Sequence, residues 1–176
     1  MSHNSTQGLI IVNTGDGKGK STAAFGQLFR ALGAGLNCEV YQFIKKQKSS
    51  EIKLLEKYFP EPKVHITGLG FTWNSQDLSE DSKAAQEGWE KAKKALSNPS
   101  LDLIVLDELT YPMNYNMIDC EEVYNSLKNR PSHQHVIITG RDANNTLIEL
   151  TDTVTKMVSI KHHYDSDTPS QRGLEF

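Results

Sequence analysis

Cysteine is scarce in this chain, and no hydrophobic segment is long. The two cysteines among its 176 residues, Cys38 and Cys120, form neither a CxxC pair nor a zinc-ligand spacing, so we expect small buried thiols and no disulfide. No apolar run approaches the roughly 20 residues of a membrane-spanning helix. Residues 1–7 are polar and lack the apolar core of a secretory signal. These absences predict a cytoplasmic protein without a membrane partner.

A surplus of positive charge is also missing. Lysine and arginine total 19 against 22 aspartates and glutamates, which gives a formal net charge of -3 and an isoelectric point of about 6.1. Proteins that bind nucleic acid more often have a basic domain. Residues 45–48, Lys-Lys-Gln-Lys, form a short basic run that we interpret as a solvent-exposed loop. We therefore expect no nucleic acid partner.

The chain does contain enough hydrophobic material for one folded domain. Hydrophobic residues make up 37% of it and charged residues 23%, and no linker, internal repeat or low-complexity segment divides the sequence. We predict a single domain over residues 1–176, in which residues 1–7 and 162–176 are flexible tails.

Short apolar runs alternate with segments of helical periodicity along the chain. The predicted strands are residues 9–12, 39–44, 64–67, 101–106, 135–139 and 153–160. The predicted helices are residues 21–33, 51–59, 77–96, 121–128 and 144–151. The third of these is the clearest, because Asp77 can cap it. Strands that alternate with helices indicate an α/β fold with a mostly parallel central sheet and helices on both faces.

A glycine-rich loop joins the first predicted strand to the first predicted helix. Residues 14–22 read TGDGKGKST, which fits the phosphate-binding pattern GxxxxGK[ST] except that the first glycine is displaced by one position, to Gly15. Glycines let backbone N–H groups turn toward phosphate oxygens, and the helix N-terminus attracts the same anion. We expect Lys20 to face solvent in the free protein and to contact the phosphates of ATP, and the Ser21 hydroxyl to reach Mg²⁺. The context favours an ATP-binding P-loop over a glycine-rich turn with exposed lysines.

Two acids follow the apolar run 101–106. Asp107 and Glu108 stand where ligands of parallel sheets collect, at the carboxyl end of a strand. Acids placed there can hold Mg²⁺ directly or through water, whereas the alternative is a helix cap or a surface acid pair. Adjacent residues on an extended strand point to opposite sides, so we expect the two acids to differ in role.

Two arginines are further candidates for the same site. Arg141 follows the next predicted strand, where it could reach a phosphate or a carboxylate, and a structural ion pair is the open alternative. Arg30 lies in the predicted helix that begins after the loop. No Ser-His-Asp arrangement is visible, and the six histidines lack metal-ligand spacing. The sequence therefore predicts a site for phosphate and Mg²⁺ without a nucleophilic triad.

Four blocks of sequence carry a resemblance to a known family. They are residues 14–25 (TGDGKGKSTAAF), 68–77 (GLGFTWNSQD), 101–111 (LDLIVLDELTY) and 136–152 (VIITGRDANNTLIELTD), with residues 40–45 as a weaker fifth. In these blocks the chain resembles the P-loop ATP:corrinoid adenosyltransferases, also called cob(I)alamin adenosyltransferases. GFTW and LDELTY are specific, because other P-loop proteins rarely carry both. The displaced first glycine is itself typical of the family.

The resemblance implies a RecA-like P-loop fold and a defined reaction. Co(I) of a corrinoid such as cob(I)alamin attacks the 5′ carbon of MgATP and gives adenosylcobalamin and triphosphate, in cobalamin biosynthesis or salvage. Because cobalt is the nucleophile, no residue is expected to act as an acid or base, and Lys20, Phe71 and Trp73 would act by positioning. Family members are usually homodimers, and an electron-donor protein such as a flavodoxin would supply the reduced cobalt.

The resemblance also implies a set of binding residues. The loop and the resemblance together give Gly15, Asp16, Gly17, Lys18, Gly19, Lys20, Ser21, Thr22 and Arg141 as ATP-binding residues, and Arg30 is added because it lies in the helix after the loop. Mg²⁺ would lie near Ser21 and Glu108, with Asp107 as a further ligand. Phe71 and Trp73 would lie against the corrin ring. Taken without the resemblance, the two rings are better explained by packing in the core beneath a loop, because most aromatic residues serve packing.

Two competing functions stay open on the residues alone. A small P-loop ATPase or kinase would release ADP, whereas a non-catalytic nucleotide-binding switch would bind ATP without turnover. The second alternative includes a RecA-like nucleic-acid binder, against which the acidic balance argues. The chain also departs from the family in two places. Few residues precede its first predicted strand, where some members have a helix that covers the site, and residues 161–167 carry acids where members are rich in Gly, Ala and Lys. We therefore expect the shielding of the site and the tail contacts to differ.

Overall fold

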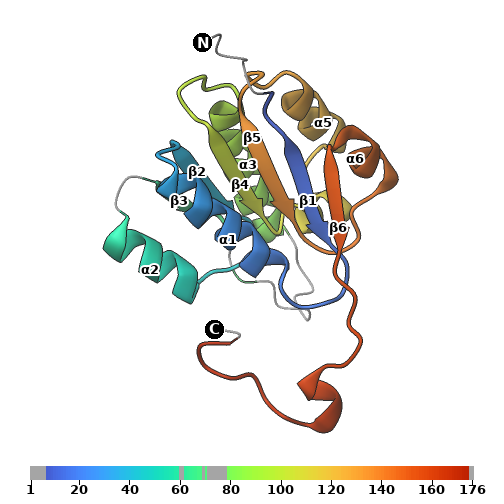
Figure 1. Cartoon of the computed structure of the whole chain (residues 1–176). Coiled ribbons are helices and arrows are strands. Elements are labelled where there is room, and N and C mark those ends of the chain that lie inside the picture. Colours follow the sequence, from blue (N-terminus) through green and yellow to red (C-terminus); the bar gives the residue numbers. More distant parts are fainter. Residues whose placement is uncertain (1–6, 60–61, 69, 71–78, 175–176) are drawn as a thin grey trace.

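A parallel sheet of six strands lies at the centre of the protein (Figure 1). The computed structural model describes residues 7–59, 62–68, 70 and 79–174. The strands are β1 (Ile10–Thr14), β2 (Cys38–Gln42), β3 (Lys63–Ile66), β4 (Leu103–Asp107), β5 (His135–Thr139) and β6 (Thr153–Lys156). They lie in the order β3-β2-β4-β5-β1-β6, and every neighbouring pair is parallel. The carboxyl ends of the strands therefore share one edge, where a ligand site is expected.

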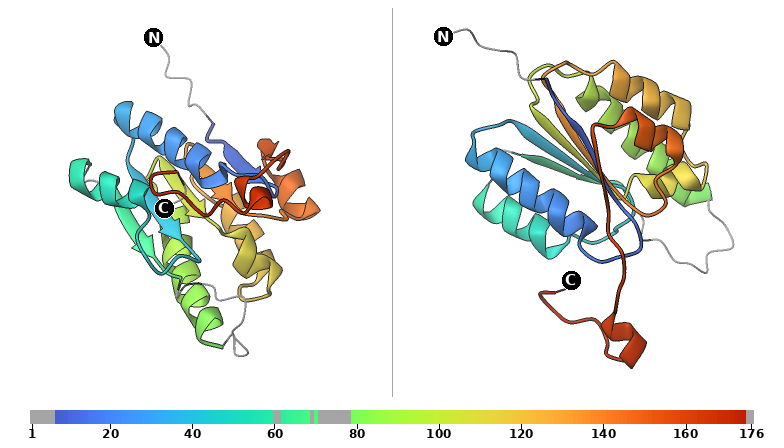
Figure 2. Two further views of the ribbon diagram at one scale, coloured as in Figure 1. Left: turned by 90° about the horizontal axis from the view of Figure 1, so that it is seen from below. Right: turned by 45° about the vertical axis from the view of Figure 1, so that its right-hand side comes forward.

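Helices cover both faces of this sheet (Figures 1 and 2). They are α1 (Lys20–Gly33), α2 (Ser50–Tyr58), α3 (Ser79–Leu96), α4 (Thr110–Asn114), α5 (Cys120–Lys128) and α6 (Asn145–Leu150), with a 3₁₀ helix at His163–Ser166. α1 and α2 supply Phe25 and Ile52 to a core beneath one face. α3 and α5 supply Trp89 and Leu127 to the core beneath the other. The sheet is thus buried on both sides, as parallel sheets usually are.

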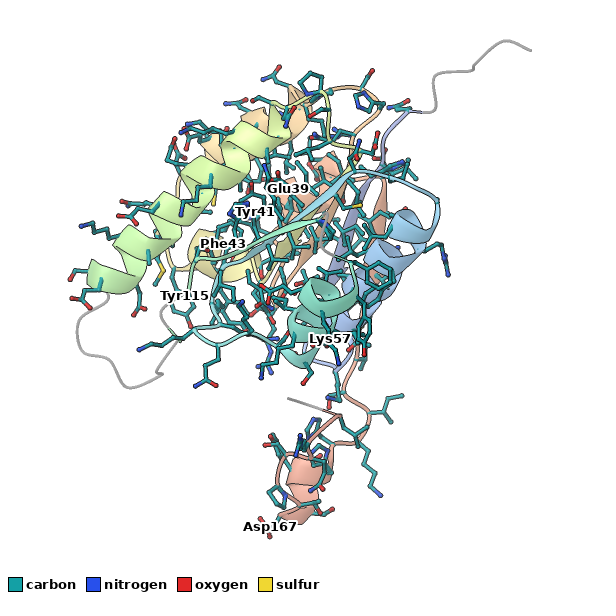
Figure 3. All side chains as sticks on the ribbon, turned by 90° about the vertical axis from the view of Figure 1, so that its left-hand side faces the viewer. Glu39, Tyr41, Phe43, Lys57, Tyr115 and Asp167 are labelled. Atoms are coloured by element: carbon teal, nitrogen blue, oxygen red, sulfur yellow. The ribbon has the colours of Figure 1, made fainter. Side chains whose placement is uncertain are left out.

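Alternation along each strand decides which side chains reach which face. On β4, Val105 belongs to the core beneath α1 and Leu106 to the core beneath α3. On β2 and just beyond it, Tyr41 and Phe43 belong to the α3 side, and Figure 3 shows them one after the other along this strand. The same alternation places Asp107, the last residue of β4, on the α1 side of the sheet.

The helices differ in how their first backbone N–H groups are used. Ser49, Asp119 and Asn144 cap α2, α5 and α6 with side-chain oxygens. α1 instead begins after Gly19, which has a φ of 106° and no side chain to offer. The first N–H groups of α1 are therefore available to a ligand, together with the positive end of the helix dipole.

The α/β fold predicted from the sequence is confirmed, and every predicted strand and helix has a counterpart. The sheet is entirely parallel over the described residues, where a mostly parallel one was predicted. The strand predicted over residues 153–160 is too long, because β6 ends at Lys156. Met157 then leaves the sheet to contact the glycine-rich loop. The short helix α4 was not predicted, and Asp77 lies outside the described residues.

Candidate functional site

The glycine-rich loop between β1 and α1 is supported by a segment from much later in the chain. The N–H of Gly17 donates to the carbonyl oxygen of Met157 at 2.8 Å. A Cβ atom placed on Gly15 would lie 2.3 Å from that same oxygen, and the φ of Gly15 is 96°. The N–H of Met157 donates in turn to the carbonyl oxygen of Thr14 at 2.8 Å. Close backbone approach therefore requires glycine at positions 15 and 17, and it fixes the loop without a ligand.

Lys20 is buried, so the expectation that it faces solvent is wrong. It is 9% exposed, and its Nζ donates to the carbonyl oxygen of Gly17 at 2.8 Å. The ammonium therefore folds back over the loop. Burial lowers the pKa of Lys20, while the neighbouring Glu108 carboxylate opposes this effect. A partly dehydrated ammonium at this position interacts strongly with an incoming anion.

A pocket of about 520 Å³ opens beside the loop, and we call it the phosphate pocket. It is lined by Lys18, Gly19, Lys20, Ser21, Thr22, Lys45, Ser49, Ser50, Glu51, Leu54, Glu108, Gly173 and Leu174. Three lysines and the N-termini of α1 and α2 thus border one cavity. This composition suits a polyanion, because lysines and helix N-termini both attract negative charge.

Asp107 is fully buried at the end of β4. Its Oδ2 accepts a hydrogen bond from Nε2 of Gln42 at 2.9 Å, and its Oδ1 accepts one from Oγ1 of Thr139 at 2.7 Å. Both carboxylate oxygens are therefore already engaged by neighbouring strands. This arrangement favours a positioning role or a metal contact through water, and direct ligation by Asp107 stays a prediction.

Glu108 differs from Asp107 in its backbone conformation and in the hydrogen bonding of its carboxylate. It has a φ of 62°, a strained value for this residue type, and its N–H donates to Oγ1 of Thr139 at 2.9 Å. Its Oε2 is buried and has no hydrogen-bond partner among the described residues. Burial, reinforced by the Asp107 charge, raises the pKa of Glu108 to about 7. A buried carboxylate oxygen without a partner is suited to a cation.

The residues beside the phosphate pocket fit Mg²⁺. Across the described part of the chain, no group of three or more His, Cys, Asp and Glu side chains could hold a metal by itself. Mg²⁺ usually keeps several waters and binds through one or two protein oxygens plus substrate phosphates. Ser21 and Glu108 both border the pocket and could supply those oxygens.

The two candidate arginines occupy different places. Arg141 lies near the loop, where its Nε is 3.9 Å from Oδ1 of Asp16, and its charge acts on both Lys20 and Glu108. The pair is largely exposed, so Arg141 is able to exchange Asp16 for a ligand. Arg30 lies in the last turn of α1, ten residues and therefore about 15 Å beyond Lys20 along the helix axis. The structure does not bring Arg30 to the phosphate pocket.

Three parts of the phosphate pocket were not predicted from the sequence, namely Lys45, the start of α2 and the tail. Lys45 lines the pocket, although it was interpreted as part of a solvent-exposed loop. Gly173 and Leu174 line it too, and the carbonyl oxygen of Leu174 accepts a hydrogen bond from Nζ of Lys18 at 2.7 Å. Figure 2 shows the tail leaving β6 and turning back toward the ends of α1 and α2. For Lys45 one signal was available, its place just after a strand of a parallel sheet, whereas the tail contact has no local signal.

The predicted corrinoid-binding residues, Phe71 and Trp73, lie outside the described residues. Their approach to a corrin ring therefore stays a prediction. Gly70, just before them, is fixed by a hydrogen bond from its N–H to the carbonyl oxygen of Ile44 at 3.0 Å. In the described part of the chain, no helix is long and apolar enough to cross a membrane.

Comparison with known proteins extends the match beyond the loop. Residues 6–176 match the family described as ATP:corrinoid adenosyltransferase BtuR/CobO/CobP. A corrinoid adenosyltransferase of Sinorhizobium sp is 44% identical over 173 residues, which are 97% of this chain and 81% of that protein. Corrinoid adenosyltransferase CobA of Salmonella typhimurium is 44% identical over 171 residues, covering 97% of this chain and 86% of the relative. The corrinoid adenosyltransferase of Escherichia coli gives the same identity and coverage.

Proposed function

This chain belongs to the ATP:corrinoid adenosyltransferase family and is a transferase, and we propose that its phosphate pocket holds the triphosphate of ATP while the adenosyl group passes to the cobalt of a corrinoid. One observation carries this placement. Lys18, Lys20 and Glu108 line one cavity at the N-terminus of α1, and Oε2 of Glu108 has no hydrogen-bond partner among the described residues. A triphosphate with a bound cation needs this combination of charges.

The reaction forms a cobalt–carbon bond and breaks a carbon–oxygen bond. The Co(I) substrate donates an electron pair to the 5′ carbon of ATP, and the electrons of the C5′–O bond leave with triphosphate. Negative charge grows on the leaving oxygen, so preorganised cations in the phosphate pocket lower the barrier. No proton needs to be moved in this reaction, so it requires no acid–base pair.

The described residues divide this work among them. Lys18, Lys20 and the N–H groups of α1 would bind the triphosphate and hold the 5′ carbon in line for attack. Ser21 and Glu108 would hold Mg²⁺, which neutralises part of the phosphate charge when bound. Asp107 would act through its hydrogen bonds at the end of β4, where it fixes the strand that presents Glu108.

A product assay tests the proposal. The protein is incubated with MgATP and chemically reduced cobalamin, and the cobalt–carbon product is followed by its absorption spectrum. We expect adenosylcobalamin and triphosphate in equal amounts. Release of ADP and phosphate without alkylated cobalt would instead indicate an ATPase or kinase, and binding of ATP without any turnover would indicate a switch.

Three further properties are proposed from the family resemblance. The protein would be a homodimer, it would act in the cytoplasm, and an electron-donor protein such as a flavodoxin would reduce the corrinoid. Light scattering on the purified protein measures the first. For the third, reduced flavodoxin should replace the chemical reductant in the product assay, whereas an unreduced flavodoxin control should give no product.

A further inference from the structure

Lys45 borders the phosphate pocket from a wall that does not belong to the glycine-rich loop. The segment that carries it continues from β2 and is fixed on both sides. The N–H of Phe43 donates to the carbonyl oxygen of Asp107 at 3.1 Å, and the N–H of Gly70 donates to that of Ile44 at 3.0 Å. The backbone before Lys45 is therefore held by the end of β4 and by the segment at residue 70.

The other lysines of the same basic run are placed differently. Lys45 is half-buried and lines the phosphate pocket, whereas Lys46 is exposed and does not line it. Lys48 is paired with Glu56 of α2 at 2.7 Å. Lys45 also lies near enough to Glu108 for its charge to act on that carboxylate. Among the lysines of residues 45–48, Lys45 is thus the one whose charge acts within the phosphate pocket.

The start of α2 belongs to the same wall as Lys45. Ser49, which caps α2, borders the pocket together with Ser50 and Glu51. Lys18 and Lys20 enter from the loop wall, so the cavity has cations on two sides. A short phosphate chain can be neutralised from the loop wall alone. A longer chain carries more negative charge and occupies more of the pocket, so we expect part of it to face the second wall.

We propose that Lys45 binds the triphosphate chain from the second wall and makes the pocket select triphosphate over shorter phosphate chains. The inference rests on the proposed function and adds a specificity-determining residue to it. Lys45 takes no part in bond formation. It stabilises the extended anion in the substrate and in the leaving group, and contributes least when the chain is too short to reach it.

The test measures binding of two inorganic probes, tripolyphosphate and pyrophosphate, by titration calorimetry with Mg²⁺ present. Lys45→Ala should weaken tripolyphosphate binding by roughly tenfold or more, the range expected for losing a hydrogen bond between charged groups. Its effect on pyrophosphate should stay within about threefold. Lys46→Ala, the matched control, should change neither value by more than about twofold, and Lys45→Arg should keep the preference for the longer chain.

Three outcomes would overturn the inference. Lys45→Ala could match Lys46→Ala, or it could weaken both probes equally, or Lys45→Arg could lose the preference while its thermal midpoint is unchanged. The proposed function is tested separately by the adenosylcobalamin product. If the parent protein forms that product and binds tripolyphosphate, while Lys45→Ala binds tripolyphosphate as tightly as the parent, the proposal for Lys45 alone is wrong. If the parent protein neither forms product nor binds tripolyphosphate, both are wrong.

Discussion

Glu108 combines two unfavourable features, a left-handed backbone conformation and a buried carboxylate oxygen that has no hydrogen-bond partner within the described ranges. Natural proteins keep such features mainly where they serve a site. Its N–H is satisfied by Thr139, which also donates to Asp107, so one hydroxyl connects both acids. The strain is therefore local and supported by the neighbouring strand, as expected for a residue held ready for a cation.

The raised pKa of Glu108 has a consequence for stability without ligand. The pKa of Glu108 is about 7 in the folded protein and 4.5 in the reference state, so the folded protein favours the protonated carboxyl. The stability that this preference contributes is fully present below about pH 4.5 and is lost as pH rises through 7. Glu108→Gln should therefore be more stable than the parent above pH 7, by on the order of 2 kcal/mol, and should lose that advantage near pH 5. Urea denaturation across pH measures this. Glu87→Gln, an exposed control, should show no such difference, and a constant gain at all pH values would contradict the assignment.

Lys20 gives a second prediction at this scale. Lys20→Ala should lower kcat/KM for ATP by about a hundredfold or more, because a preorganised cation beside the leaving group is lost. The ligand-free fold should keep its stability, since its Nζ bonds a loop carbonyl and burying the charge is itself costly. The exposed Lys18→Ala is the control and should lose less. Near-normal turnover of Lys20→Ala at low ATP would show that the loop assignment is wrong.

Phe71 and Trp73 lead to a prediction that separates two steps. The family resemblance implies that these rings displace the lower axial ligand of a Co(II) corrinoid, which makes its reduction easier. Phe71→Ala and Trp73→Ala should then reduce the rate severalfold more when the assay begins from Co(II) with a mild reductant than when Co(I) is supplied. Equal losses in the two assays would indicate simple corrinoid binding. A loss of thermal stability without a selective defect would indicate core packing.

The single residues show how far sequence patterns reach into the site. Lys20, Ser21 and Glu108 were predicted because a motif and a strand end each place a residue type at a known position. Lys45 was missed because its neighbours in sequence resemble an exposed basic loop, and only the pairing of β2 with β4 brings it to the pocket. Arg30 was included on proximity in sequence, and ten helical residues separate it from the loop.

At the scale of elements, the entry into α1 is tightly constrained. A Cβ atom on Gly17 would lie 2.7 Å from the carbonyl carbon of Met157, whereas a Cβ on Gly26, within α1, would have nothing within 4 Å. Gly17→Ala should therefore lower the free energy of unfolding by about 1–3 kcal/mol. Gly26→Ala should raise it by about 0.5–1 kcal/mol, because alanine favours the helix. Urea denaturation of both compares them. Equal changes in the free energy of unfolding for the two substitutions would show that the close approach of Met157 does not require glycine at position 17.

Most of the helices and strands could be predicted from the sequence, because hydrophobic residues recur along each of them with a simple period. β4 is buried at all five positions, as a central parallel strand requires, and its apolar run identified it. β6 was overextended because the residues after Lys156 look like a strand, whereas the carbonyl oxygen of Met157 accepts a hydrogen bond from Gly17 of the loop. α4 was missed because it has five residues and contains Pro112, which is tolerated in a first turn.

At the scale of the whole molecule, the phosphate pocket joins segments that are distant in sequence. The loop, the end of β2, the end of β4 and the tail all border it. A ligand bound there stabilises the folded chain by mass action, by about 2.7 kcal/mol at a concentration one hundred times its Kd. We therefore expect MgATP to raise the thermal midpoint by about 5–10 °C.

Removing the metal provides the control for that experiment. Excess EDTA should take away most of the increase if Glu108 and Ser21 hold Mg²⁺ together with the phosphates. The Lys20→Ala protein should show little increase in either condition. An increase that EDTA leaves unchanged would contradict a metal-assisted pocket.

The contact between Met157 and the glycine-rich loop affects how conservation of the loop glycines should be interpreted in related proteins. Gly15 and Gly17 are required by main chain contributed about 140 residues later, whether or not a nucleotide is present. In a descendant that lost ATP binding, purifying selection for folding would preserve both glycines. Lys20 and Ser21, which act on the ligand, would be free to drift. Within such a lineage, the lysine and the serine would therefore mark surviving function, and the glycines would mark only a shared architecture.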